Sequence, residues 1–193
     1  MRKILVNISG ASACELGFLL LKYLKNKGEI FAIVSKNAQI SFKKENLNFV
    51  SDDFIKDISD EFDLEHVKFL DNENISECVA SGSFGIDTTF ITPCSVNTLA
   101  KIACGISDNL ITRSAAVALK ERKKLILGVR EMPYSSISLE QMMKLSYQGV
   151  IIAAPIIASY AKSENLDDMK KFIIGKWLDL ANIGHNLYKR WEG

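Results

Sequence analysis

Four charged residues that could carry chemistry lie close together in one segment of this sequence, DNLITRSAAVALKERKKLILGVREMP. Arg113 and Lys120 are seven residues apart, so on a helix they share one face. Arg130 and Glu131 follow directly after the apolar run KLILGV, where a strand is expected to end. The segment predicts a local site that binds an anion beside an acid. A solvated helix face and an ion pair on the rim are the structural alternatives.

Composition restricts the class of partner that this segment can serve. The chain has 193 residues and a formal net charge of +1, with 48% hydrophobic and 24% charged residues. These values are ordinary for a globular protein, and we expect one domain over residues 1–193. A nearly neutral chain is not expected to bind nucleic acid or an anionic membrane surface, because both partners call for a strongly basic face.

Short β-branched runs alternate with longer runs of helical period, and this alternation predicts the fold class. Strands are expected at 3–8, 30–35, 67–70, 88–92, 124–129 and 150–154, and helices at 15–26, 96–104, 108–122, 138–148 and 166–181. The charged stretch 37–66 predicts one helix on the rim. The order predicts a single-domain, Rossmann-like, doubly wound α/β fold with a mostly parallel six-stranded sheet and helices on both faces.

Ligands of such folds bind beyond the carboxyl ends of the strands, so the residues at each strand exit are candidates for a site. The first exit reads ISGAS, in which Gly10 allows a tight turn and Ser12 offers an N–H and a hydroxyl at a helix start. Ser35 follows the second strand. The fourth exit, TPCSVNT, offers hydroxyls and an amide to an anion or to the edge of a flavin, with helix capping by Ser95 as the alternative.

Metal sites and membrane segments are not expected. Four cysteines are spread along the chain without a CxxC pair, which predicts reduced thiols in a cytoplasmic protein. The segment SDDFIKD has Lys56 where an aspartate-rich magnesium site would need its third acid, so we expect a helix start capped by Ser51 or Asp52. The run GVIIAAPIIA is about half the length that a bilayer requires.

Several motifs together resemble the UbiX/Pad-type flavin prenyltransferases over essentially the whole chain: ISGAS, ASGSF, PCSVNTLAKIA, DNLITRSAAVALKERKKLILGVREMP, APIIASY and the closing RW. The resemblance implies transfer of a dimethylallyl group from dimethylallyl phosphate to reduced FMN, first to N5 and then by ring closure at C6. The product would be prenylated FMN for a UbiD-type decarboxylase. No metal ion would take part.

The resemblance also implies roles for individual residues. It implies FMN contacts for Gly10, Ala11, Ser12, Ser35, Ser95, Val96, Asn97, Thr98 and Arg130, contacts with the prenyl phosphate for Tyr160, Lys176, Arg113 and Lys120, and catalytic roles for Glu131, Glu45 and Ser12. The cations would replace a metal ion in stabilising the departing phosphate, and Glu131 would exchange a proton with it.

Assembly is implied as well, because the enzymes of this family are large homo-oligomers, commonly dodecamers. Small residues around Ala116 predict an exposed helix face between Arg113 and Lys120 that packs against a neighbouring subunit. Some polar residues of the site would then be contributed across subunits.

Three departures from the family pattern keep alternatives open. Ala13 replaces the usual glycine, Leu16 a frequent tyrosine, and Asn97 the lysine of many members. An asparagine there is also typical of flavin-dependent cysteine decarboxylases, which share the fold. Those enzymes carry a histidine before the fourth strand and an MNxxM-type segment after the fifth, where this chain reads VASGSF and REMP. A non-catalytic flavin carrier is the third interpretation.

Overall fold

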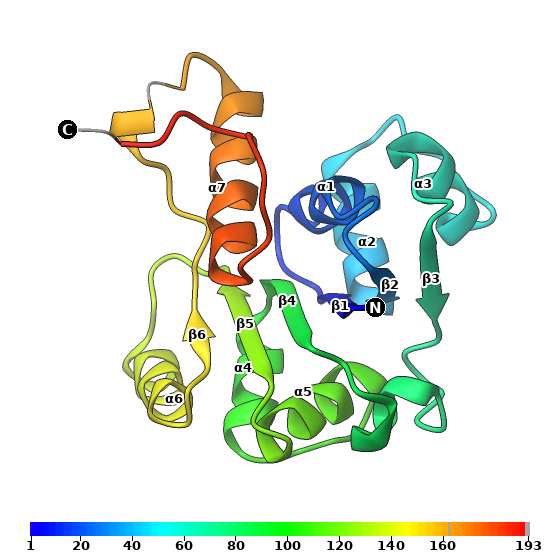
Figure 1. Cartoon of the computed structure of the whole chain (residues 1–193). Helices are drawn as coiled ribbons and strands as arrows, with labels where there is room; N and C mark the ends of the chain where they lie inside the picture. The colour runs from blue at the N-terminus through cyan, green and yellow to red at the C-terminus, as the bar shows by residue number, and fades with distance from the viewer. Residues whose placement is uncertain (162, 192–193) are drawn as a thin grey trace.

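The strands form one parallel sheet, as the alternating pattern predicts. A computed structural model describes residues 1–161 and 163–191 (Figure 1). Its strands are β1 (Lys3–Ile8), β2 (Glu29–Val34), β3 (Val67–Leu70), β4 (Thr88–Cys94), β5 (Lys124–Val129) and β6 (Ile151–Ile152). All pairings are parallel, in the order β3-β2-β1-β4-β5-β6. This is the strand order of the Rossmann fold, so the predicted fold class is confirmed.

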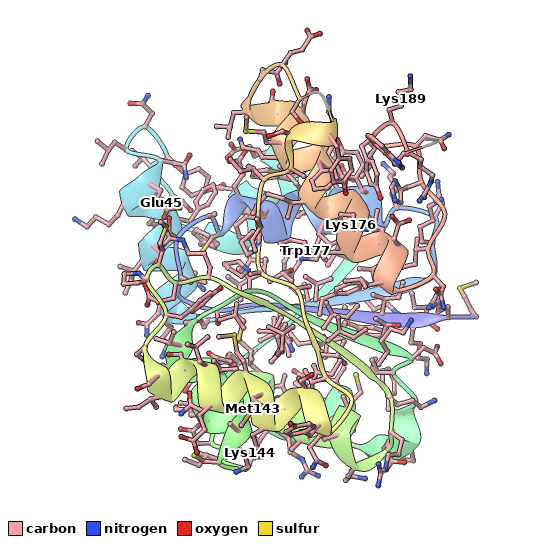
Figure 2. The ribbon with its side chains drawn as sticks, turned by 90° about the vertical axis from the view of Figure 1, so that its left-hand side faces the viewer. Glu45, Met143, Lys144, Lys176, Trp177 and Lys189 are labelled. Carbon is pink, nitrogen blue, oxygen red and sulfur yellow. The ribbon has the colours of Figure 1, made fainter. Side chains whose placement is uncertain are left out.

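Helices cover both faces of the sheet, which is seen edge-on in Figure 2. One face packs against α1 (Glu15–Tyr23), α2 (Lys36–Glu45), α3 (Phe54–Phe62) and α7 (Leu166–Leu180). The other packs against α4 (Val96–Ala103), α5 (Leu110–Lys120) and α6 (Ser136–Tyr147). Neighbouring strand residues alternate between the two cores, so Ile4 and Val6 join the first and Leu5 the second. Each central strand therefore has to be apolar throughout.

The structure corrects two details of the predicted elements. Residues 37–66 hold two helices, α2 and α3, rather than one, and α3 is capped by Asp53, whose side chain accepts from the Lys56 N–H at 3.2 Å, instead of by Ser51 or Asp52. The last strand is also shorter than predicted, although the Ala153 N–H still donates to the Leu127 carbonyl at 2.8 Å.

Short 3-10 turns complete the described elements: η1 (Cys78–Ala80), η2 (Gly82–Phe84) and η3 (Ser159–Ala161). Within the described ranges, none of the helices has the length and apolar character that crossing a membrane would require.

Candidate functional site

A cavity of about 670 Å³ opens at the carboxyl ends of β1, β2, β4 and β5. Its wall includes every residue for which the sequence predicts an FMN contact, together with Glu131 from the predicted catalytic set. The cavity is lined by Ser9, Gly10, Ala11, Ser12, Ser35, Lys36, Asn37, Ser41, Asn72, Glu73, Ser95, Val96, Asn97, Thr98, Lys101, Asn109, Ile111, Arg130 and Glu131. The strand exits thus bring together residues that are far apart in the sequence.

The loop after β1 lies against the start of α2, and this contact requires glycine at position 10. A Cβ atom built on Gly10 would lie 2.5 Å from the Cβ of Asn37. Ser9 joins this loop to the exit of β4: its hydroxyl donates to the Pro93 carbonyl at 3.1 Å and accepts from the Ser95 N–H at 2.9 Å. Sequence reasoning missed Ser9, because its role depends on a contact between two strands.

Three helices begin at the cavity, and each of their capping residues lines it. Ser35 accepts from the Ala38 N–H at 3.1 Å, Ser95 from the Thr98 N–H at 3.2 Å, and Asn109 from the Thr112 N–H at 3.0 Å. These bonds cap α2, α4 and α5. The alternative that Ser95 caps a helix is therefore confirmed. Three helix N-termini provide free N–H groups and partial positive charge, which favour an anion in the cavity.

Charged side chains of both signs line the same cavity. Arg130 continues the β4–β5 ladder with its N–H, which donates to the Cys94 carbonyl at 3.0 Å, and its side chain is exposed. Glu131 is also exposed, and its carboxylate accepts from the Met132 N–H at 3.1 Å. The predicted cation and acid thus lie together on the cavity wall.

Sequence reasoning did not predict two further polar residues of the cavity wall, Lys101 and Asn72. Lys101 lies one helical turn after Asn97 and pairs with Asp108 at 2.6 Å. Asn72 is buried, and its side-chain oxygen accepts from the Ile111 N–H at 3.2 Å, which fixes the start of α5 to the exit of β3. A lysine four residues after a predicted contact on a helix was the available signal for Lys101.

Glu45, the last residue of α2, contacts the loop that follows β1. Within the described part of the chain it is not part of the cavity wall, and both of its carboxylate oxygens accept from the Ala13 N–H, at 3.1 and 3.2 Å. Ala13 has a φ of 67°, in the left-handed region that favours glycine. Burial, followed by the Glu45 charge, raises the pKa of the neighbouring Cys14 to about 12, so this thiol stays protonated.

Tyr160 and Lys176 lie in a second cavity, of about 470 Å³, at α7 and the chain segment that follows it. Asp179, Tyr188, Arg190 and Trp191 complete its lining. The Tyr160 ring packs edge-on against Phe172, with 5.5 Å between ring centroids. Figure 2 shows Lys176 well apart from Glu45, which lies near the exit of β1. One chain therefore does not bring the two predicted groups of binding residues together.

Arg113 and Lys120 occupy a third place, along α5. The Arg113 side chain donates to the Ala80 carbonyl at 3.1 Å, and Lys120 pairs with Glu121. Among the described residues, both lie outside the two cavities above. The prediction of an exposed apolar face was too broad, because α5 is largely buried in its own chain and the half-buried Ala116 lies between the two cations.

Within residues 1–161 and 163–191, no cluster of three or more histidine, cysteine, aspartate or glutamate side chains could hold a metal ion.

Known proteins are similar to this chain over nearly its whole length. The family model described as Flavoprotein matches residues 1–178. A flavin prenyltransferase UbiX from Campylobacter jejuni is 54% identical over 190 residues, which cover 98% of each chain. The crystal structure of a UbiX protein in complex with FMN and dimethylallyl pyrophosphate superposes with a TM-score of 0.89 at 33% identity, covering 100% of this chain and 98% of that one.

A second solved structure adds information on assembly. It is a dodecameric FMN-dependent UbiX-like decarboxylase from Escherichia coli O157:H7, with a TM-score of 0.89 and 33% identity over 100% of both chains.

Proposed function

This chain belongs to the Flavoprotein family and is a flavin prenyltransferase, and from that premise we propose how its residues divide the work of the reaction. The observation that carries the proposal is the cavity at the strand exits, whose wall contains all the predicted FMN contacts. We propose that residues 1–193 form one functional domain.

The cavity fits FMN by its size and by the donors on its wall. A volume of about 670 Å³ lies within the range of small-molecule sites, and the N-termini of α2, α4 and α5 offer N–H groups to the phosphate. Gly10 permits close approach of the main chain, and Arg130 adds a cation. When bound, reduced FMN would supply N5 and C6 as the positions that receive the dimethylallyl group.

The chain's charged residues have to stabilise the leaving phosphate. When the bond between prenyl C1 and the phosphate oxygen breaks, its electron pair remains on the phosphate, so negative charge grows there. Lys176, Arg113, Lys120 and Arg130 are the cations that would stabilise this charge, and Tyr160 would donate a hydrogen bond. Glu131, exposed on the wall of the flavin cavity, would exchange a proton with the phosphate.

The separation of these residues in one chain supports a site shared between subunits. These residues occupy three different places on the molecule: the cavity at the strand exits, the second cavity with Tyr160 and Lys176, and the helix α5 with Arg113 and Lys120. A homo-oligomer can bring these places together, because a surface of one copy then faces a different surface of the next. We propose a homododecamer, the assembly of the E. coli UbiX-like structure.

Two finer assignments belong to the same proposal. Prenylated FMN would be delivered to a UbiD-type decarboxylase, and the protein would act in the cytoplasm. All four cysteines are free thiols, which suits a reducing compartment.

Cysteine decarboxylation is less well supported by the positions of the histidines. The chain has two, His66 and His185. His66 bonds to the Leu21 carbonyl at 3.0 Å and His185 to Asp179 at 3.1 Å, and neither belongs to the wall of the flavin cavity among the described residues. The stretch VASGSF before β4, where those enzymes carry their histidine, therefore has none in this chain.

One experiment tests the proposed function directly. The protein is incubated anaerobically with reduced FMN and dimethylallyl phosphate, and the mass of the flavin is measured. A gain of one C₅H₈ unit is expected. Release of CO₂ from a cysteinyl peptide, without any gain in flavin mass, would instead establish the decarboxylase. Failure of the FMN-loaded protein to bind dimethylallyl phosphate would establish a carrier.

A further inference from the structure

The chain that follows α7 folds back along this helix and is fastened to one side chain, Asp179. We call residues 185–191 the C-terminal segment. Figure 1 shows it running from the end of α7 back to η3, and Figure 2 marks α7 by Lys176 and the segment by Lys189. The Arg190 guanidinium donates to the two Asp179 oxygens at 2.7 and 3.2 Å, and the Tyr188 hydroxyl donates to the same carboxylate.

His185 adds a third contact to Asp179. Its Nδ1 accepts from the Leu187 N–H at 3.1 Å, which leaves Nε2 to donate to Asp179, also at 3.1 Å. Burial alone would raise the pKa of Asp179, but the hydrogen bonds from Arg190 and Tyr188 and the Coulomb interaction with His185 lower it to about 2. The carboxylate is therefore charged at every physiological pH, and its charge is balanced by Arg190.

Apolar contacts show that the helix surface is shaped to receive this segment. A Cβ atom on Gly175 would lie 2.6 Å from Cδ1 of Tyr188 and 2.8 Å from Cε1 of His185. The Tyr188 ring packs on Phe172 with 5.0 Å between centroids, and the Trp191 ring lies 6.2 Å from that of Tyr160. Glycine at position 175 thus provides the room that the segment needs.

The fastened segment forms a wall of the second cavity. Tyr188, Arg190 and Trp191 line it together with Tyr160 and Lys176. We propose that Asp179 is a positioning residue, which holds the C-terminal segment on α7 and thereby completes the cavity that binds the phosphate of dimethylallyl phosphate. This inference rests on the proposed function, which assigns Tyr160 and Lys176 to that phosphate. Asp179 also lines the cavity, but its carboxylate oxygens accept hydrogen bonds from His185, Tyr188 and Arg190, so we assign it to holding the segment and not to binding the phosphate.

Two independent changes should release the segment. Asp179→Ala removes the charge that holds it, and Gly175→Ala displaces it by steric overlap while leaving every ionisable group in place. When the segment is released, a smaller fraction of the molecules has a complete cavity. The apparent affinity for dimethylallyl phosphate falls in proportion to this fraction. We expect each variant to raise the KM for dimethylallyl phosphate about tenfold or more. FMN affinity and kcat at saturating substrate should stay within about threefold of wild type.

Matched controls lie on the same helix and in the adjoining turn. Asp167→Asn alters another acid of α7, one that is 76% exposed, and Gly184→Ala adds a methyl group where no atom lies within 4 Å. Both should leave the KM unchanged. Hydrogen exchange of residues 182–191 should rise in the two test variants and stay at the wild-type rate in the controls.

The outcomes separate this inference from the function on which it rests. Faster exchange in residues 182–191 with an unchanged KM would show that Asp179 only stabilises the fold, and would overturn the inference. An equal rise in KM in the controls would overturn it too. A wild type that neither binds dimethylallyl phosphate nor prenylates FMN would refute the proposed function, and this inference with it. If Asp179→Ala does not fold, Gly175→Ala and the milder Arg190→Gln decide the question.

Discussion

Replacement of Ala13 by glycine should stabilise this protein, although the substitution removes a methyl group. Ala13 has a φ of 67°, and the left-handed conformation costs an alanine about 1 to 2 kcal/mol. Glycine avoids this cost but loses about 0.5 to 1 kcal/mol more backbone entropy on folding. The midpoints of these two ranges leave about 0.75 kcal/mol in favour of glycine, which corresponds to a rise in Tm of about 1.5 to 3 °C for a chain of this length. The N–H that donates to Glu45 is kept.

Thermal unfolding of wild type and variant at equal protein concentration measures this effect, because Tm depends on concentration in an oligomer. Ala100→Gly is the control: in the interior of α4 the same chemical change should lower stability by about 0.5 to 1 kcal/mol. An Ala13→Gly variant that unfolds at or below the wild-type temperature would refute the argument that the loop is strained at this position.

Four other expectations concern the reaction, the assembly and acid stability. Glu131→Gln should keep FMN and lose most prenyl transfer in a single-turnover assay, because the amide cannot exchange a proton; near-normal turnover would remove Glu131 from the chemistry. Lys176→Ala and Tyr160→Phe should each weaken dimethylallyl phosphate binding by about one to two decades in a direct titration, with FMN binding unchanged. Ala116→Glu should dissociate the oligomer and abolish activity together, as light scattering coupled to size exclusion would reveal; an active dissociated variant would exclude a shared site. The pKa of Asp179 is about 2 in the folded protein against an ordinary 3.8, so its contribution to stability is full above pH 4 and is lost as the pH falls towards 2. Urea unfolding measured between pH 4 and pH 2 should show that the wild type loses about 2 kcal/mol of unfolding free energy that Asp179→Asn does not lose.

The sheet could be predicted from the sequence because its strands are buried on both faces. Runs such as KILVNI have no polar face to confuse the pattern, and β1 begins and ends where this run predicts. The region 37–66 was harder, because α2 buries only Ala38 and Phe42 and is otherwise polar. With so few buried positions, helical period alone could not separate α2 from α3.

The site could be predicted where it depends on strand ends, and not where it depends on contacts between distant segments. Gly10, Ser35 and Ser95 each follow a strand, so their place beside the cavity follows from the parallel sheet. Ser9 and Asp179 act through partners that only the folded chain brings near. For Asp179 these partners come from a segment with no regular secondary structure, which leaves no periodic pattern in the sequence.

A cavity built on helix N-termini has a consequence for how this enzyme can change over evolution. The N-termini of α2, α4 and α5 offer main-chain N–H groups at the cavity, and every residue type except proline supplies this group in the same place. The start of α4 therefore does not depend on the side chain of Asn97, because its cap is held by Ser95 and Thr98. A substitution at position 97 would change the side chain that α4 presents to a ligand and keep the main-chain N–H groups that the fold provides.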